Sequence, residues 1–225
     1  MTNKLIARHK ECGQLQRCLQ SDQSEFVIVY GRRRIGKTFL IEQFFNKKYD
    51  FKFVGGHKLS SKAQLTNFAK ALRKYAKVKI NELNSWSDAF DALEEYLESL
   101  PEGRKKVVFF DEMPWIDTQR SDFVSSLEYF WNSWAASQED ILFVATGSST
   151  SWMVENLIEN QGGLHNRITE SIYLRPFTLG ETEEYLVKRH FPKDRYQTFI
   201  TTYGLCNPIA WSIGHSELTI DDLFT

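Results

Sequence analysis

The sequence predicts a doubly wound α/β fold, in which helices cover both faces of a mostly parallel sheet. Two observations support this prediction. The apolar runs 26–30, 107–110 and 141–145 are continuous rather than alternating, which is typical of strands buried on both faces. Stretches with apolar residues at three- and four-residue spacing separate these runs, so strands and helices alternate along the chain.

The composition fits one large domain with a small appendage. The 225 residues are 42% hydrophobic and 14% aromatic, which is ample for a core. The 28 basic and 29 acidic residues nearly cancel, so no global field attracts nucleic acid or an anionic membrane. No apolar run approaches membrane-spanning length, and the three cysteines lack metal-ligand spacing. We therefore expect a cytoplasmic protein with reduced thiols and no membrane partner.

The individual elements follow from local periodicity. The amphipathic stretches predict helices over residues 6–20, 39–46, 65–76, 86–100, 123–134 and 152–158. The apolar or alternating runs predict strands over residues 26–30, 49–54, 107–110, 141–145 and 171–174. Ser85 with Asp88, three residues later, has the pattern of a helix capping box.

Pro176 marks the predicted boundary between a core, residues 1–175, and a partial helical lid, residues 176–225. The lid is expected to begin with a helix capped by Thr178 and Glu181. A second lid helix is predicted from the apolar stripe of Tyr196, Phe199, Ile200 and Tyr203. The tail from residue 217 onward predicts no element with a clear partner.

The strongest motif directly follows the first strand. Its residues match the pattern of Gly, four free positions, then Gly-Lys-Thr, and are Gly31, Arg32, Arg33, Arg34, Ile35, Gly36, Lys37 and Thr38. A strand that turns through glycines into a helix starting near Phe39 directs backbone N–H groups and the helix dipole at an anion. We expect Lys37 to reach the terminal phosphates of a nucleoside triphosphate and the Thr38 hydroxyl to hold Mg²⁺.

A second chemical site is expected where the strand 107–110 ends in Asp111-Glu112. Asp111 would lie beside the Mg²⁺, and Glu112 would orient or deprotonate the water that attacks the terminal phosphorus. Three hydroxyls follow the strand 141–145 at the same predicted edge of the sheet, namely Thr146, Ser148 and Ser149. Ser148 could hold the phosphate or the water, but spacing leaves its two neighbours as rivals and a plain turn as an alternative.

Several arginines are further candidates. Arg167 follows a glycine pair and could stabilise the charge of a transferring phosphoryl group, although its spacing also fits a surface salt bridge. The run Arg32 to Arg34 could be solvated or could add charge near the phosphates. Trp115 fits packing, or a partner surface if it is exposed.

Together these motifs resemble a known group, the prokaryotic AAA+/STAND-related ATPases often called the archaeal ATPase group. The similarity rests on Val29–Thr38, Phe109–Trp115 and Gly147–Met153, and it extends to Gly162–Arg167 and Leu174–Phe177. It covers about residues 5 to 203. The resemblance implies a P-loop NTPase core, with a five-stranded parallel sheet in which one strand separates the Walker A and Walker B strands, and a helical lid.

The resemblance also implies ATP as the ligand and assigns further residues. Ser148 would lie near the sensor-1 position, and Arg167 would lie where related proteins carry an arginine finger. Arg8 and Glu11 would belong to the element that lines the adenine pocket. The lid motif Gly-x-Pro appears here as Cys-Asn-Pro, ending at Pro208, so its adenine contact departs from the family pattern.

The expected function is hydrolysis of ATP with Mg²⁺ as a nucleotide-driven molecular switch. Two alternatives stay open: a scaffold that holds nucleotide with little turnover, and a phosphoryl transferase. Glu112 argues against the transferase, because a kinase binds its acceptor where this carboxylate would place water. We expect self-association through Arg167. An effector is not identified, and nucleic acid is expected to bind only through domains that this chain lacks.

Overall fold

The computed structural model describes residues 5–119, 121–159, 163–164, 166–189, 198–201 and 216–219. The chain divides into two compact units, Met1–Phe177 and Thr178–Thr225. The predicted adenine contact Pro208 and the lid residues Tyr196 and Tyr203 lie outside the described residues.

The first unit is built on one parallel sheet with the strand order β2-β3-β4-β1-β5. Its strands are β1 Glu25–Tyr30, β2 Phe51–Val54, β3 Lys106–Asp111, β4 Ile141–Gly147 and β5 Glu170–Tyr173. Strand β4 separates β1 from β3, so Val144 lies opposite Val27 on one side and Phe109 on the other. The prediction of a five-stranded parallel sheet with this order is confirmed.

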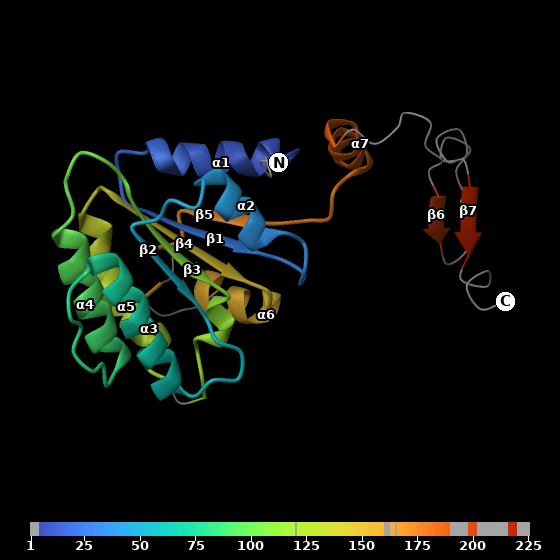
Figure 1. Ribbon diagram of the computed structural model, residues 1–225. Helices are drawn as coiled ribbons and strands as arrows, with labels where there is room; N and C mark the ends of the chain where they lie inside the picture. Colours follow the sequence, from blue (N-terminus) through green and yellow to red (C-terminus); the bar gives the residue numbers. More distant parts are fainter. Residues whose placement is uncertain are drawn as a thin grey trace. The chain divides into compact units, whose positions relative to one another are not determined.

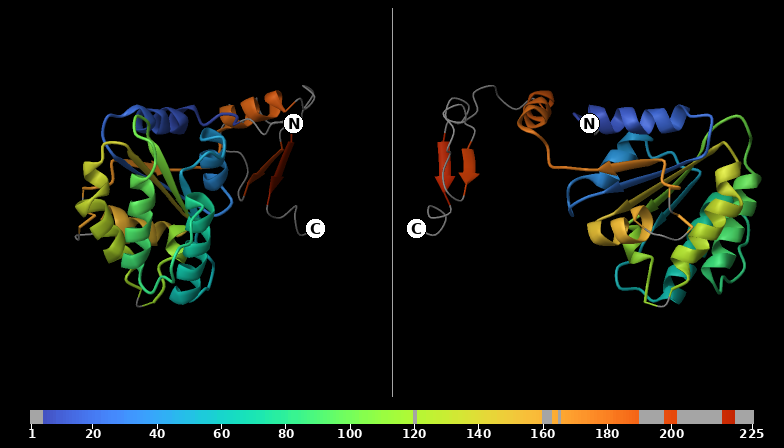
Figure 2. Two further views of the ribbon diagram at one scale, coloured as in Figure 1. Left: turned by 60° about the vertical axis from the view of Figure 1, so that its left-hand side comes forward. Right: turned by 180° about the vertical axis from the view of Figure 1, so that it is seen from behind.

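Helices cover both faces of the sheet, as Figures 1 and 2 show. One face carries α1 and α2, and the other carries α3, α4 and α5. The helices are α1 His9–Gln20, α2 Lys37–Phe44, α3 Ser61–Ala76, α4 Trp86–Glu98, α5 Phe123–Ser133 and α6 Thr150–Met153. Short 3₁₀ turns span Met113–Trp115 and Ala135–Ser137, and α6 continues into a π-helical turn, Val154–Ile158. No helix within the described ranges has both the length and the apolar character needed to cross a bilayer.

The two faces receive alternate side chains of each central strand, because successive strand residues point in opposite directions. On β1, Phe26 and Ile28 pack into the core beneath α3–α5, whereas Val27 and Val29 pack beneath α1 and α2. All four side chains are fully buried. Burial on both faces explains why these strands are continuous apolar runs in the sequence.

The second unit contains both predicted and unpredicted structure. Helix α7, Leu179–Lys188, begins with the expected capping box of Thr178 and Glu181. The predicted helix over residues 196–203 is wrong where the chain is described, because Thr198–Thr201 forms strand β6. It pairs in parallel with β7, Ser216–Thr219, in the tail for which no element was expected. The sequence Thr-Phe-Ile-Thr explains the outcome, since β-branched and aromatic residues favour strands over helices.

Candidate nucleotide site

The loop between β1 and α2 has the backbone geometry of an anion cradle. Gly31 has φ 141°, and a Cβ there would lie 2.5 Å from the carbonyl oxygen of Leu174, which directly follows β5, so this close approach requires glycine. Gly36, with φ 92°, directly precedes the first residue of α2 in a left-handed conformation. Arg34 is left-handed as well, with φ 63°. The loop therefore turns sharply and presents the N-terminus of α2 at the carboxyl edge of the sheet.

Lys37 lies inside this loop and is only 5% exposed. Its Nζ donates to the carbonyl oxygens of Gly31, at 3.0 Å, and Arg32, at 2.9 Å. Burial lowers the pKa of Lys37, and Arg33 lowers it further, whereas Glu112 and Asp111 act in the opposite direction. The ammonium group is thus partly desolvated, and within the described residues its hydrogen bonds go to neutral carbonyls, which an anionic ligand could replace.

Asp111 ends β3 and meets the phosphate loop directly. Its Oδ1 accepts hydrogen bonds from Thr38 Oγ1 at 2.9 Å and from Thr146 Oγ1 at 2.5 Å. Its second oxygen, Oδ2, accepts no hydrogen bond within the described part of the chain. The structure therefore brings together the two residues predicted to hold Mg²⁺, Thr38 and Asp111.

Glu112 is held beside this pair by strand β4. Its Oε2 accepts hydrogen bonds from Ser148 N at 3.1 Å and Ser148 Oγ at 2.8 Å, while its own N–H donates to Thr146 Oγ1 at 3.2 Å. Glu112 has φ 52°, a left-handed conformation that costs a non-glycine residue about 1 kcal/mol or more. Neighbouring residues hold the backbone in this position: Gly55 N donates to the Asp111 carbonyl, and a Cβ on Gly55 would lie 2.5 Å from the Glu112 carbonyl oxygen.

The sequence predicts that Ser148 contacts phosphate or water, and in this structure its hydroxyl contacts Glu112 instead. Thr146, which was only a rival candidate, contacts both carboxylate residues. The contribution of Gly55 was missed, and the glycine pair that ends β2 was its only signal.

The hard oxygen ligands at this edge fit Mg²⁺ but do not complete a site. The Thr38 hydroxyl and the Asp111 carboxylate are the ligand types that Mg²⁺ prefers. The described residues contain no group of three or more His, Cys, Asp or Glu side chains that could hold a metal ion. A metal ion here would need further oxygens from water or phosphate, as Mg²⁺ usually does in nucleotide sites.

A hollow of about 400 Å³ lies beside the phosphate loop. It is lined by Arg8, Arg32, Arg33, Arg34, Ile35, Pro176 and Phe177. Arg8 is 5% exposed, lies 3.5 Å from the Glu11 carboxylate, and stacks 4.4 Å from the centroid of the Phe177 ring. The three loop arginines are exposed. Four guanidinium groups around one hollow give it a positive potential, which favours anions.

One predicted residue, Arg167, does not join this cluster. Arg167 precedes β5, and Thr169 N bonds to the Phe26 carbonyl near the start of β1, so Arg167 lies at the amino edge of the sheet. The phosphate loop follows β1 at the opposite edge. Arg167 is exposed. Phe39, on the first turn of α2, is 38% exposed.

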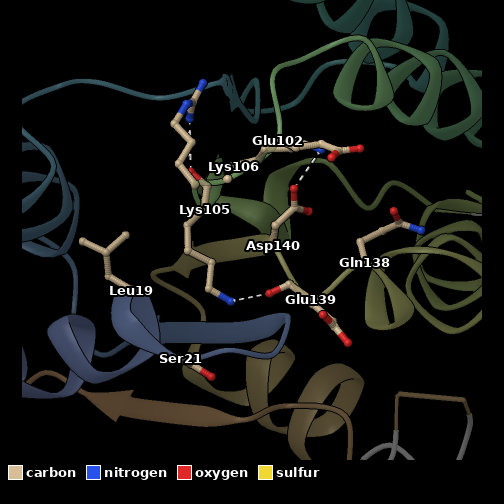
Figure 3. A pocket seen from close by; sticks show the side chains of 10 residues that line it. Leu19, Ser21, Glu102, Lys105, Lys106, Gln138, Glu139 and Asp140 are labelled. Atoms are coloured by element: carbon tan, nitrogen blue, oxygen red, sulfur yellow. Dashed lines mark hydrogen bonds and ion pairs between the residues drawn. The ribbon is translucent and has the colours of Figure 1, made fainter.

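A second hollow, of about 470 Å³, lies at the opposite edge of the sheet from the phosphate loop, the amino edge. It is found between α1 and the starts of β3 and β4 (Figure 3). Here the basic side chains have protein partners. Lys106 lies 2.9 Å from the Asp140 carboxylate, and Lys105 Nζ donates to the carbonyls of Glu139, at 2.7 Å, and Gln23. The hollow contains no residue of the phosphate loop, so we assign the candidate site to the carboxyl edge.

Comparisons with known proteins agree with this geometry. A family model described as an ATPase domain predominantly from Archaea matches residues 5–197. An uncharacterized protein of Methanocaldococcus jannaschii is 24% identical over 219 residues, which make up 96% of this chain and 45% of that protein.

Solved structures with a similar fold include a Walker-type ATPase of Pyrococcus abyssi, with a TM-score of 0.60, 19% identity, and coverage of 82% of this chain and 57% of that one. The ORC2 protein of Aeropyrum pernix in its ADP form has a TM-score of 0.54, 17% identity, and coverage of 88% and 56%. Cdc6p of Pyrobaculum aerophilum has a TM-score of 0.58, 15% identity, and coverage of 87% and 53%. These structures share the fold, and the chain spans about half the length of these relatives.

Proposed function

This chain belongs to the family of ATPase domains found predominantly in archaea, and from that premise we propose that it hydrolyses ATP with Mg²⁺ as a nucleotide-driven molecular switch. One observation carries the proposal. Thr38 and the distant pair Asp111-Glu112 form one hydrogen-bonded cluster through strand β4, beside the loop that holds Lys37. Phosphoryl transfer needs this combination of cation, metal ligands and a group that positions water.

Each side chain has a definite role in the proposal. The Lys37 ammonium moves from the loop carbonyls to the β- and γ-phosphates. Thr38 and Asp111 would hold Mg²⁺, which would neutralise phosphate charge. A water molecule attacks the γ-phosphorus, its proton passes to Glu112, and the bond from that phosphorus to the bridging oxygen breaks to leave ADP. Oε1 of Glu112 is suited to receive the proton, because only Oε2 takes hydrogen bonds from described residues.

The nucleotide base is assigned to the hollow lined by Arg8 and Phe177. A purine ring could stack against this pair, while Arg32 to Arg34 lie where they add positive charge beside the phosphates. Phe39 would flank the phosphates from α2. A contact from Pro208 stays a prediction.

Arg167 is proposed to act on a second copy of the chain. Its position at the amino edge of the sheet separates it from the phosphate loop of its own subunit. Its exposure leaves it accessible to another molecule. Delivery of this arginine across an interface would make hydrolysis depend on assembly, which is one way to build a switch.

A second candidate function is a nucleotide-holding scaffold with little turnover. The two hydrogen bonds from Ser148 to Glu112 favour it, because they restrain the carboxylate that would act as base. A phosphoryl transferase is the weaker alternative.

Binding of a fluorescent ATP analogue and release of phosphate, with and without added acceptors, separate the three functions. A switch ATPase binds and releases phosphate into water, a scaffold only binds, and a transferase needs an acceptor. Lys37→Ala should abolish binding, with Lys105→Ala as the matched control at the other edge of the sheet. Unchanged affinity in a folded Lys37→Ala protein would refute the assigned phosphate loop.

A further inference from the structure

Among the hydroxyls of the described residues, that of Thr146 alone contacts both Asp111 and Glu112. Thr146 lies one residue before the end of β4 and is fully buried. Its Oγ1 lies 2.5 Å from Asp111 Oδ1 and 3.2 Å from the backbone nitrogen of Glu112. One side chain therefore contacts both consecutive residues that carry the proposed chemistry.

The directions of these two hydrogen bonds follow from chemistry. A backbone N–H can only donate, so Thr146 Oγ1 must accept from Glu112. A threonine hydroxyl has a single proton, and the bond to Asp111 is the one remaining place for it. The hydroxyl is thus fixed as a donor to the carboxylate of Asp111 and as an acceptor from the backbone of Glu112.

This arrangement also selects which carboxylate oxygen a cation can use. Thr38 and Thr146 both donate to Oδ1 of Asp111. Oδ2 takes no hydrogen bond from described residues and is left for a cation. The Thr38 hydroxyl can hold a metal ion through a lone pair while its proton stays on Oδ1, so Thr38 and Thr146 can both remain donors to that oxygen.

We propose that Thr146 is a positioning residue that couples metal binding by Asp111 to the placement of Glu112. A cation that shifts the Asp111 carboxylate would also shift the Thr146 hydroxyl, which is hydrogen-bonded to it. Through its second hydrogen bond, that hydroxyl would shift the left-handed backbone of Glu112. The inference rests on the proposed function, since it concerns the same metal and base. It predicts that loss of the hydroxyl weakens the metal site and disturbs the base together.

The test compares Thr146→Val, which keeps the shape and removes the hydroxyl, with Thr146→Ser, which keeps the hydroxyl. The matched control is Ser24→Ala, because the buried Ser24 hydroxyl accepts from Ile141 N at the other end of the same strand. Two quantities are measured: the Mg²⁺ concentration that half-saturates binding of a fluorescent ATP analogue, and the rate of phosphate release.

The Val variant should need about tenfold more Mg²⁺ and lose at least tenfold in phosphate release, as expected for a lost hydrogen bond to a charged group. Thr146→Ser should restore both values to within about threefold of wild type, and Ser24→Ala should match wild type. If the Val protein does not fold, Thr146→Cys replaces it, because a thiol is a weak donor and acceptor.

A folded Val or Cys variant with the wild-type Mg²⁺ requirement would overturn the inference, as would a Ser variant that fails as badly as the Val variant. The Mg²⁺ readout needs no turnover. A wild-type protein that binds the analogue with Mg²⁺ but releases no phosphate therefore refutes hydrolysis and still tests Thr146.

Discussion

The two edges of the sheet differ in the partners of their central charged residues. At the amino edge, two cations pair with anions: Lys106 lies 2.9 Å from Asp140, and Arg104 makes two hydrogen bonds to the Asp50 carboxylate. Lys105 is an exception, because it donates to backbone carbonyls. At the carboxyl edge, Lys37 donates to neutral carbonyls, and Asp111 accepts from neutral hydroxyls. Charges that satisfy one another stabilise the fold. Charges held by neutral partners remain available for a ligand of the opposite sign.

Arg167 provides the strongest test of this contrast, because it lies at the amino edge and yet is proposed to act in hydrolysis. An arginine delivered across an interface is worth about three to five orders of magnitude in rate. Arg167→Ala should therefore lower phosphate release by about that factor at high protein concentration, and wild-type specific activity should rise with concentration.

Mixing two inactive proteins tests whether Arg167 acts on the active site of another subunit. Arg167→Ala supplies an intact Glu112, and Glu112→Gln supplies an intact Arg167, so the mixture should recover part of the activity that each lacks. A flat concentration profile together with failed complementation would show that Arg167 acts within its own subunit or only in structure.

Glu112→Gln should have the next largest effect on phosphate release, and it tests the carboxyl edge itself. Removal of a catalytic base typically costs about two to four orders of magnitude, whereas ATP binding should be retained. Phosphate release and analogue binding are measured on the same preparation. Glu139→Gln, an exposed glutamate of the amino edge, is the control and should change neither. Equal hydrolysis by Glu112→Gln and wild type would place the base elsewhere.

Sequence reasoning predicted the sheet and the residue types of the site because both depend on local patterns. Continuous apolar runs mark buried strands, and the spacing of Gly31 to Thr38 is itself the loop. The partners of Thr146 and Ser148 could not be predicted, since they depend on the left-handed backbone of Glu112. That conformation depends in turn on Gly55, which is distant in sequence.

Substitutions at the amino edge should change the free energy of unfolding and leave ligand binding unchanged. Lys106→Met removes the partner of Asp140, whose Oδ1 is already buried without a hydrogen bond. Breaking a buried pair costs about 3–5 kcal/mol, and the 23% exposure of the Asp140 side chain reduces this to about 1–3 kcal/mol. Urea unfolding measures the loss. Adding Asp140→Asn should recover part of it, and ATP-analogue affinity below the unfolding transition should stay at the wild-type value.

The smallest effect concerns two lysines, one at each edge, whose pKa values are both lowered by burial: Lys37 and Lys105. Below its unfolded pKa of about 10.4, the unfolded chain binds more protons than the folded one, so stability rises as pH increases toward that value. The slope cannot exceed about 1.4 kcal/mol per pH unit for a single proton. Lys37→Met and Lys105→Met should each remove their own part of the rise, as measured by urea unfolding between about pH 8 and 10.5.

Adding ATP should distinguish the two edges. Phosphates beside Lys37 favour its charged form and should cancel its contribution, so that Lys37→Met no longer changes the slope, while the effect of Lys105→Met persists. If ATP leaves both contributions unchanged, Lys37 does not meet the phosphates, and the proposed contrast between the edges is wrong.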